Sequence, residues 1–169
     1  MNPVLAAWNE AKEKEAMEIM ISCCGARRWA EEMTALRPIE SIAALSEAAD
    51  RVWSTMQEPD WLEAFACHPR IGEREPKHAT NQSTQWSQEE QAGSAGAASG
   101  ILAELAELNA LYEQRFGFTY IVCATGKSGG EMLEILKRRI HSDRESELRE
   151  AAEQQRKIMQ IRLGKWLAS

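Results

Sequence analysis

One short segment, Phe118–Ala124, carries the β-branched and aromatic residues that favour a strand, and no other segment of the chain resembles it. A lone strand has no neighbour to pair with, so it does not form a stable sheet in water. Elsewhere the apolar residues recur at spacings of three and four, which is the pattern of amphipathic helices. The sequence therefore predicts an all-α fold, a helical bundle with one extended connector segment.

Short breaks separate the predicted helices, without a linker or an internal repeat. A length of 169 residues fits one domain with one core, so we expect a single domain over residues 1–169. Helices are expected over residues 3–24 in two pieces, then over 26–36, 41–57, 60–68, 87–116, 129–140 and 143–167. Their expected N-terminal residues include Ser41, Asp60, Ser87 and either Ser142 or Asp143.

The composition argues against several classes of protein. A net charge of −6 without a concentrated basic surface argues against a nucleic-acid binder. No apolar run approaches the roughly 20 residues of a membrane span, and the N-terminus is acidic rather than signal-like. Cys23, Cys24, Cys67 and Cys123 show no CxxC spacing, so we expect reduced thiols in a cytoplasmic protein.

The stretch Phe65–Gln91 is the candidate functional segment. Its interior, residues 69–86, reads as a long polar loop, which is uncommon in a compact domain unless it is functional or disordered. His68 follows Phe65 by three positions, so its imidazole is expected at the edge of the core, where Pro69 ends a helix. His68 taken alone also fits a structural histidine.

Two further positions have both a structural and a functional interpretation. Ser87-Gln-Glu-Glu90 is the pattern of a capping box at a helix start, but it also offers a hydroxyl and a carboxylate to a site. Arg162 lies on the buried stripe of the last helix, where a guanidinium needs an anion unless its head reaches water. That stripe consists of Leu148, Ala151, Ala152, Gln155, Ile158, Met159, Leu163 and Trp166.

Together, an imidazole, a carboxylate and an arginine suit proton transfer on a small anionic molecule without a metal. A phosphate-binding loop at Thr125-Gly-Lys-Ser128 is disfavoured, because the pattern needs glycine at the position of Ile121. A metal site is disfavoured as well. The three histidines, at positions 68, 78 and 141, lie on separate segments without a metal-binding spacing.

Several segments, in order along nearly the whole chain, resemble the 2-oxo-4-hydroxy-4-carboxy-5-ureidoimidazoline (OHCU) decarboxylases. They are CCGARRWAEEM from Cys23, the Arg37-Pro38 step, DWLEAFACHPRIGE from Asp60, WSQEEQAG from Trp86, YEQRFGFTYIVCATG from Tyr112 and KIMQIRL from Lys157. The resemblance implies an all-helical homodimer that converts OHCU to (S)-allantoin, the last step of urate oxidation, without a metal or an organic cofactor.

The same resemblance assigns roles to particular residues. His68 and Glu90 fall on the family's catalytic positions, and Ser87, Gln91 and Arg162 fall on its substrate-binding positions. Further pocket walls are implied at Pro69, Phe118, Ile121, Cys123 and Ala124. Two alternatives remain at this point: a lyase that acts on another small ureide or imidazoline, and a helical dimer module without catalysis.

Overall fold

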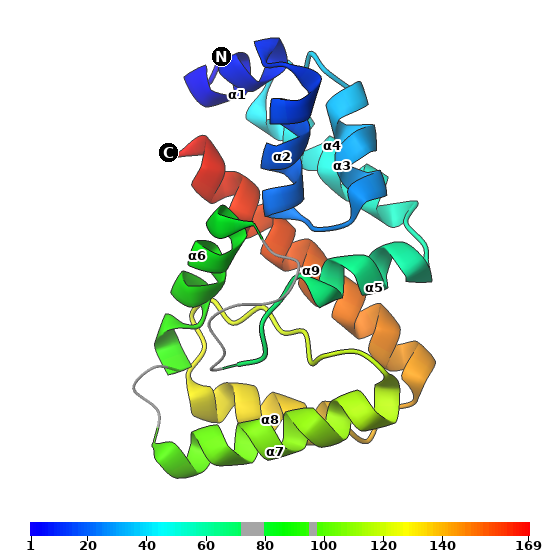
Figure 1. Ribbon diagram of the computed structural model, residues 1–169, viewed down its shortest axis with the longest axis vertical. Coiled ribbons are helices and arrows are strands. Elements are labelled where there is room, and N and C mark those ends of the chain that lie inside the picture. The colour runs from blue at the N-terminus through cyan, green and yellow to red at the C-terminus, as the bar shows by residue number, and fades with distance from the viewer. Residues whose placement is uncertain (72–79, 95–97) are drawn as a thin grey trace. The chain divides into compact units, whose positions relative to one another are not determined.

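The structure is a computed structural model that describes residues 1–71, 80–94 and 98–169, and every regular element within them is a helix (Figure 1). The predicted all-α class is confirmed. Residues 118–124 form no strand and run as an extended connector, as expected, and all of them except Thr119 are buried. Of the helices in the described ranges, none combines the length and the apolar composition that crossing a bilayer requires.

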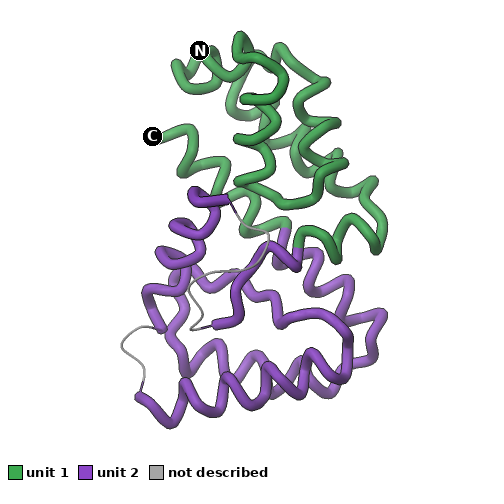
Figure 2. The backbone as a smooth tube through the Cα atoms, viewed as in Figure 1, with its two compact units in different colours: residues 1–64, 156–169 green, residues 65–155 purple. Residues whose placement is uncertain are grey.

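The chain divides into two compact units, shown in different colours in Figure 2. Unit 1 contains residues 1–64 and 156–169, and unit 2 contains residues 65–155. The prediction of a single domain stays a prediction. The helices are α1 (Pro3–Glu10), α2 (Glu13–Cys23), α3 (Arg27–Ala35), α4 (Ile42–Ser54), α5 (Glu58–Ala66), α6 (Asn81–Glu90), the 3-10 helix η1 (Ala92–Ser94), α7 (Ser99–Phe116), α8 (Gly129–Arg139) and α9 (Arg144–Leu167).

Unit 1 has a core rich in tryptophan. The indole N–H of Trp8 donates to the carbonyl of Ala16 at 3.0 Å, and that of Trp29 donates to the carbonyl of Ala49 at 3.1 Å. The ring of Trp166, near the end of α9, meets the ring of Trp8 edge to face with centroids 5.9 Å apart. Each of the two buried indole N–H groups thus has a partner, so these rings add apolar contact without an unsatisfied donor.

Unit 2 has a core built around aromatic rings. Tyr112 and Phe116 of α7 lie 4.7 Å apart between ring centroids, and Phe118 and Tyr120 of the connector both lie 5.7 Å from Tyr112. Phe65, near the end of α5, lies 5.5 Å from Phe118. The connector therefore supplies core residues to unit 2.

Of the four predicted helix starts, two are confirmed, and the other two, Asp60 and Ser87, are wrong. The hydroxyl of Ser41 accepts from the N–H of Ala44 at 3.1 Å, and a carboxylate oxygen of Asp143 accepts from the N–H of Ser146 at 2.9 Å. Asp60 is not an N-cap, because α5 already begins at Glu58. The carboxylate of Asp60 instead lies in the first turn and accepts from the N–H of Gln57, the residue before the helix, at 2.9 Å.

The predicted single helix over residues 87–116 is also wrong. Ser87 lies inside α6, whose N-cap is Thr80: its hydroxyl accepts from the N–H of Ser83 at 3.0 Å. A 3-10 helix and then α7 follow. A methyl group on Gly93, in the 3-10 helix, would overlap the carbonyl oxygen of Lys127. That close approach of two backbone segments accounts for a glycine at position 93.

Candidate active site

His68 lies directly after α5 in unit 2. The helix ends at Ala66, two residues before His68, and the N–H of His68 still donates to the carbonyl of Phe65 at 3.1 Å. The imidazole is partly exposed, and its Nε2 lies 2.7 Å from the side-chain oxygen Oε1 of Gln155 on α9. The predicted place of His68 at the edge of the core is therefore confirmed, with a polar partner that the sequence did not indicate.

The His-Pro-Arg turn is tied to α7 by an ion pair. Pro69 is buried, and the guanidinium of Arg70 meets both carboxylate oxygens of Glu113, Nε to Oε1 at 2.7 Å and Nη2 to Oε2 at 2.6 Å. The hydrogen bonds from Arg70 lower the pKa of Glu113 below its ordinary value of 4.5, against the opposing effect of burial. This pair fixes the turn that follows His68 against α7 within unit 2.

Ser87 and Glu90 occupy the last turn of α6, and both are buried, with 2% and 8% of their surface exposed. Gln91 caps the helix C-terminus, and its N–H donates to the carbonyl of Ser87 at 3.1 Å. The capping-box interpretation of Ser87 and Glu90 is wrong, because they lie at the end of a helix rather than at its beginning. Two buried polar side chains on one face of α6 favour a functional interpretation instead.

The connector offers fewer free backbone groups than expected. The N–H of Tyr120 donates to the side chain of Asn109 at 3.2 Å, and the N–H of Cys123 donates to the side chain of Gln154 at 2.9 Å. The carbonyl of Cys123 accepts from the ammonium of Lys127 at 2.7 Å. Within the described part of the chain, the backbone groups of buried Val122 have no hydrogen-bond partner. These hydrogen bonds occupy part of the connector backbone that was predicted to be open.

A buried charged network holds the connector at Ile121. The guanidinium of Arg139 donates from Nη1 to the carbonyl of Ile121 at 2.5 Å and from Nε to the carboxylate of Glu147 at 2.6 Å. The hydroxyl of Tyr112 donates to the same carboxylate oxygen at 2.5 Å. Burial and this hydrogen bond raise the pKa of Tyr112. Burial opposes the charge of Arg139, but the hydrogen bond and charge of Glu147 outweigh it, so the pKa of Arg139 is raised.

The connector residues that were predicted as pocket walls are all buried in unit 2. They are Phe118, Ile121, Cys123 and Ala124, none of which is more than 7% exposed. Phe118 contacts Phe65, which lies three residues before His68, so the connector passes close to the end of α5 that precedes His68. The connector and His68 thus belong to the same packed region.

Arg162 belongs to unit 1, where it is 2% exposed and donates from Nη1 to the carbonyl of Ser22 at 3.3 Å. The alternative in which its head reaches water is wrong. Burial raises the pKa of the neighbouring Cys23 thiol, and the positive charge of Arg162 opposes that rise. The structure thus confirms a guanidinium directed at the core of unit 1.

Four polar residues that hold His68 and the connector were not predicted from the sequence: Asn109, Arg139, Gln154 and Gln155. The sequence contained one signal: Gln155, like Arg162, is a polar residue on the mostly apolar stripe of α9, and it is fully buried. Neither α7 nor α8 carries a comparable signal for Asn109 or Arg139, since single polar residues are common on helices.

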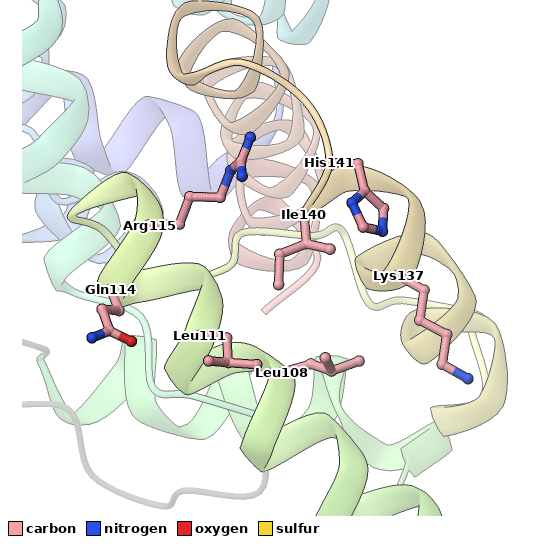
Figure 3. A pocket seen from close by; sticks show the side chains of 7 residues that line it. All are labelled: Leu108, Leu111, Gln114, Arg115, Lys137, Ile140 and His141. Atoms are coloured by element: carbon pink, nitrogen blue, oxygen red, sulfur yellow. The ribbon is translucent and has the colours of Figure 1, made fainter.

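A surface pocket of about 710 Å³ lies between α7 and the end of α8 in unit 2 (Figure 3). Its lining residues are Leu108, Leu111, Gln114, Arg115, Lys137, Ile140 and His141. None of the predicted site residues lines it, so it does not coincide with the candidate site. The described residues contain no group of three or more side chains arranged to hold a metal ion, and His78 lies outside the described ranges.

Proteins of known function include relatives of this chain. The Uric acid degradation bifunctional protein TTL of Arabidopsis thaliana is 38% identical over 144 residues, which is 85% of this chain and 44% of that protein. The Uric acid degradation bifunctional protein of Bacillus sp. (strain TB-90) is 28% identical over 92% of this chain and 30% of its own length. The chain therefore spans less than half the length of these two relatives.

Solved structures provide a match in the fold. A crystal structure of OHCU decarboxylase in the presence of (S)-allantoin has a TM-score of 0.77 and 33% identity, and the match covers 94% of this chain and 100% of that one. A crystal structure of (S)-allantoin synthase has a TM-score of 0.70 at 18% identity, over 96% of this chain and 53% of that one, so it supports the fold alone. A family model for OHCU decarboxylase matches residues 9–164, and the chain belongs to that family.

Proposed function

We propose that this protein decarboxylates OHCU to (S)-allantoin, the last step of urate oxidation. The observation that carries this proposal is the family match over residues 9–164. The structural similarity to an OHCU decarboxylase crystallised in the presence of (S)-allantoin, over the whole of that chain, supports it. The buried polar face of α6 and the histidine at the end of α5 supply residue types that this chemistry needs.

The reaction requires no external electron acceptor. When the bond between the ring carbon and the carboxylate breaks, carbon dioxide leaves and the electron pair forms a double bond to the neighbouring ring carbon. The C=N bond of that neighbour releases its own pair to nitrogen, which takes a proton. The hydroxyl then becomes a carbonyl as its proton is lost, and a proton added to the neighbouring carbon creates the stereocentre. A cofactor-independent reaction is therefore consistent with the substrate's own electronic structure.

The proposed roles follow from the chemistry of each side chain. His68 exchanges the proton of the substrate hydroxyl, since a histidine side chain can both give and take a proton near neutral pH. Glu90 holds the N–H groups of the ureido arm or the ring, and Ser87 and Gln91 complete that hydrogen bonding. Arg162 binds the substrate carboxylate through two parallel hydrogen bonds. The proposed walls are Pro69, Phe118, Ile121, Cys123 and Ala124.

We also propose a homodimer and a cytoplasmic location, and both proposals rest on the family resemblance. The oligomeric state is tested by sedimentation velocity over a hundredfold range of protein concentration. A single species with the mass of two chains supports the dimer, and a monomer at all concentrations contradicts it.

The activity is tested by forming OHCU in situ from urate and following the optical activity of the allantoin produced. Spontaneous decay gives racemic allantoin, so the active protein produces a growing circular dichroism signal of the (S) enantiomer. If purified, folded protein leaves the signal at the level of the spontaneous reaction, the proposed function is wrong. A panel of other ureides and imidazolines then tests a related substrate.

The site is tested with His68→Ala and Glu90→Ala, each of which removes a group that handles or positions a proton. We expect each variant to lose about 10²- to 10⁴-fold in kcat/KM while retaining its helical content. The matched controls are His141→Ala and Glu89→Ala, which remove the same side chains at exposed positions of unit 2 and leave turnover within about twofold of wild type. Wild-type activity in Glu90→Ala contradicts the assignment.

A further inference from the structure

Two consecutive glutamines of α9, Gln154 and Gln155, contact two different parts of the candidate site. Gln154 accepts a hydrogen bond from the N–H of Cys123 in the connector at 2.9 Å. Gln155 places its oxygen Oε1 2.7 Å from Nε2 of His68, and its side chain is fully buried. One turn of one helix therefore fixes the position of both the connector and the imidazole.

The contact between Gln155 and His68 constrains where the imidazole carries its proton. An amide oxygen only accepts, so a hydrogen bond to Oε1 requires a proton on Nε2 of His68. The distance of 2.7 Å lies within the range of an N–H···O hydrogen bond. A neutral imidazole has one N–H, so Nδ1 then carries a lone pair.

The other end of the Gln155 amide supports a place beside the substrate. Its nitrogen Nε2 is buried and has no hydrogen-bond partner within the described structure. Buried amide N–H groups are rarely left unpaired in native proteins, and a water molecule or a ligand oxygen is the usual explanation. The Gln155 side chain thus has its oxygen on His68 and an N–H donor that remains unpaired among the described residues.

We infer that Gln155 is a positioning residue for His68, holding the imidazole as the tautomer with its proton on Nε2 and leaving Nδ1 as the proton acceptor. The catalytic consequence rests on the proposed function, since it assigns the proton of the substrate hydroxyl to the unprotonated Nδ1. When Nδ1 takes that proton, the Nε2–H bond to Gln155 becomes charge-assisted and strengthens. Gln155 therefore favours the protonated state of His68 that forms during the reaction.

The tautomer is measured by NMR of the ¹⁵N-labelled full-length protein, through couplings between the imidazole nitrogens and the ring protons, at a pH where His68 is neutral. The set of imidazole signals that disappears in His68→Gln is assigned to His68. We expect a protonated Nε2 and an unprotonated Nδ1 in the wild type, and a mixture of tautomers in Gln155→Met. Gln154→Met is the control, and it should leave the His68 signals unchanged.

Two further readouts separate positioning from a purely structural role. Gln155→Met is expected to lower kcat by about 10- to 100-fold with little change in KM, as loss of a partner that orients a functional imidazole does. Gln155→Glu places a carboxylate against Nε2 and should raise the midpoint of the His68 titration by about 1 to 3 pH units relative to wild type. The second variant retains the shape of glutamine, so it tests the inference even if the methionine variant does not fold.

The inference is overturned by a wild-type His68 with its proton on Nδ1, or by a His68 titration that Gln155→Glu leaves unchanged. The NMR measurements need no substrate, so their result is independent of turnover. If the His68 NMR spectra are as expected but no (S)-allantoin forms in the activity assay, the proposed function alone is refuted. Stereospecific turnover with an unaltered His68 spectrum in Gln155→Met would refute this inference alone.

Discussion

Replacement of Glu147 by leucine is expected to be among the most damaging single changes to the stability of unit 2. The carboxylate of Glu147 is 1% exposed and receives hydrogen bonds from both Arg139 and Tyr112 through one oxygen. The substitution Glu147→Leu keeps a side chain of similar volume but removes the negative charge. It leaves the guanidinium of Arg139, which is 5% exposed, as an uncompensated buried charge.

The magnitude follows from that unpaired charge. Removing one partner of a buried ion pair costs about 3–5 kcal/mol, because the other charge cannot regain its hydration. The hydroxyl of Tyr112 also loses its acceptor, but the two costs arise at one site and do not simply add. For a chain of this size each kcal/mol lowers Tm by about 2–4 °C, so we expect Tm to fall by about 6–20 °C.

Thermal and urea unfolding followed by far-UV circular dichroism measure this loss. The matched control is Glu145→Leu on the same helix, where the pair with Arg149 is more than 70% exposed on both sides, and it should cost less than about 0.5 kcal/mol. The double variant Arg139→Met/Glu147→Leu removes both charges and should recover about 2 kcal/mol relative to Glu147→Leu. A cost below about 1 kcal/mol for Glu147→Leu, or strictly additive losses in the double variant, would refute the argument.

Two further pairs of variants test the local structure by differential scanning calorimetry. Thr80→Ala removes the N-cap of α6 and should lower the free energy of unfolding by about 1 kcal/mol. If Ser87 instead capped the helix, Ser87→Ala would cause that loss. A larger loss in Ser87→Ala than in Thr80→Ala would therefore contradict the observed helix start. Gly93→Ala forces a methyl group against the carbonyl of Lys127 and should cost about 1–3 kcal/mol. A methyl group at Gly100 has no atom near it, so Gly100→Ala should stabilise the protein by up to about 1 kcal/mol. Equal effects of the two substitutions would contradict the close approach of Gly93 to Lys127.

Much of the helical fold could be predicted because apolar periodicity and capping residues identify most elements independently. Ser41 and Asp143 cap the helices at the expected places. The single β-like segment is a connector because it has no neighbouring strand to pair with. The start of α6 was missed for a physical reason. Its buried face consists of Ser83, Trp86, Ser87 and Glu90, which have helical spacing but are mostly polar, so hydrophobic periodicity does not detect it.

The candidate site was only partly predictable. His68 and Arg162 were noticed as polar groups on apolar helix faces, and the family resemblance assigned their roles; the burial of Arg162 agrees with a guanidinium directed at the core. The residues that orient the site act through tertiary contacts instead: Gln155 meets His68 across 87 sequence positions. No local pattern encodes such a pairing, and only the folded chain brings the two groups together.

The division of unit 1 into two segments has a consequence for synthesis. Its first segment ends at Ala64 and its second begins at Arg156, so Trp166 leaves the ribosome long after its ring partner Trp8. At about 5–20 residues per second, roughly 5 to 20 s pass between the two segments. During that interval the N-terminal helices have an incomplete apolar core, which is exposed to the cell's folding machinery. A stop codon anywhere between the segments leaves that core without the half of α9 that completes it.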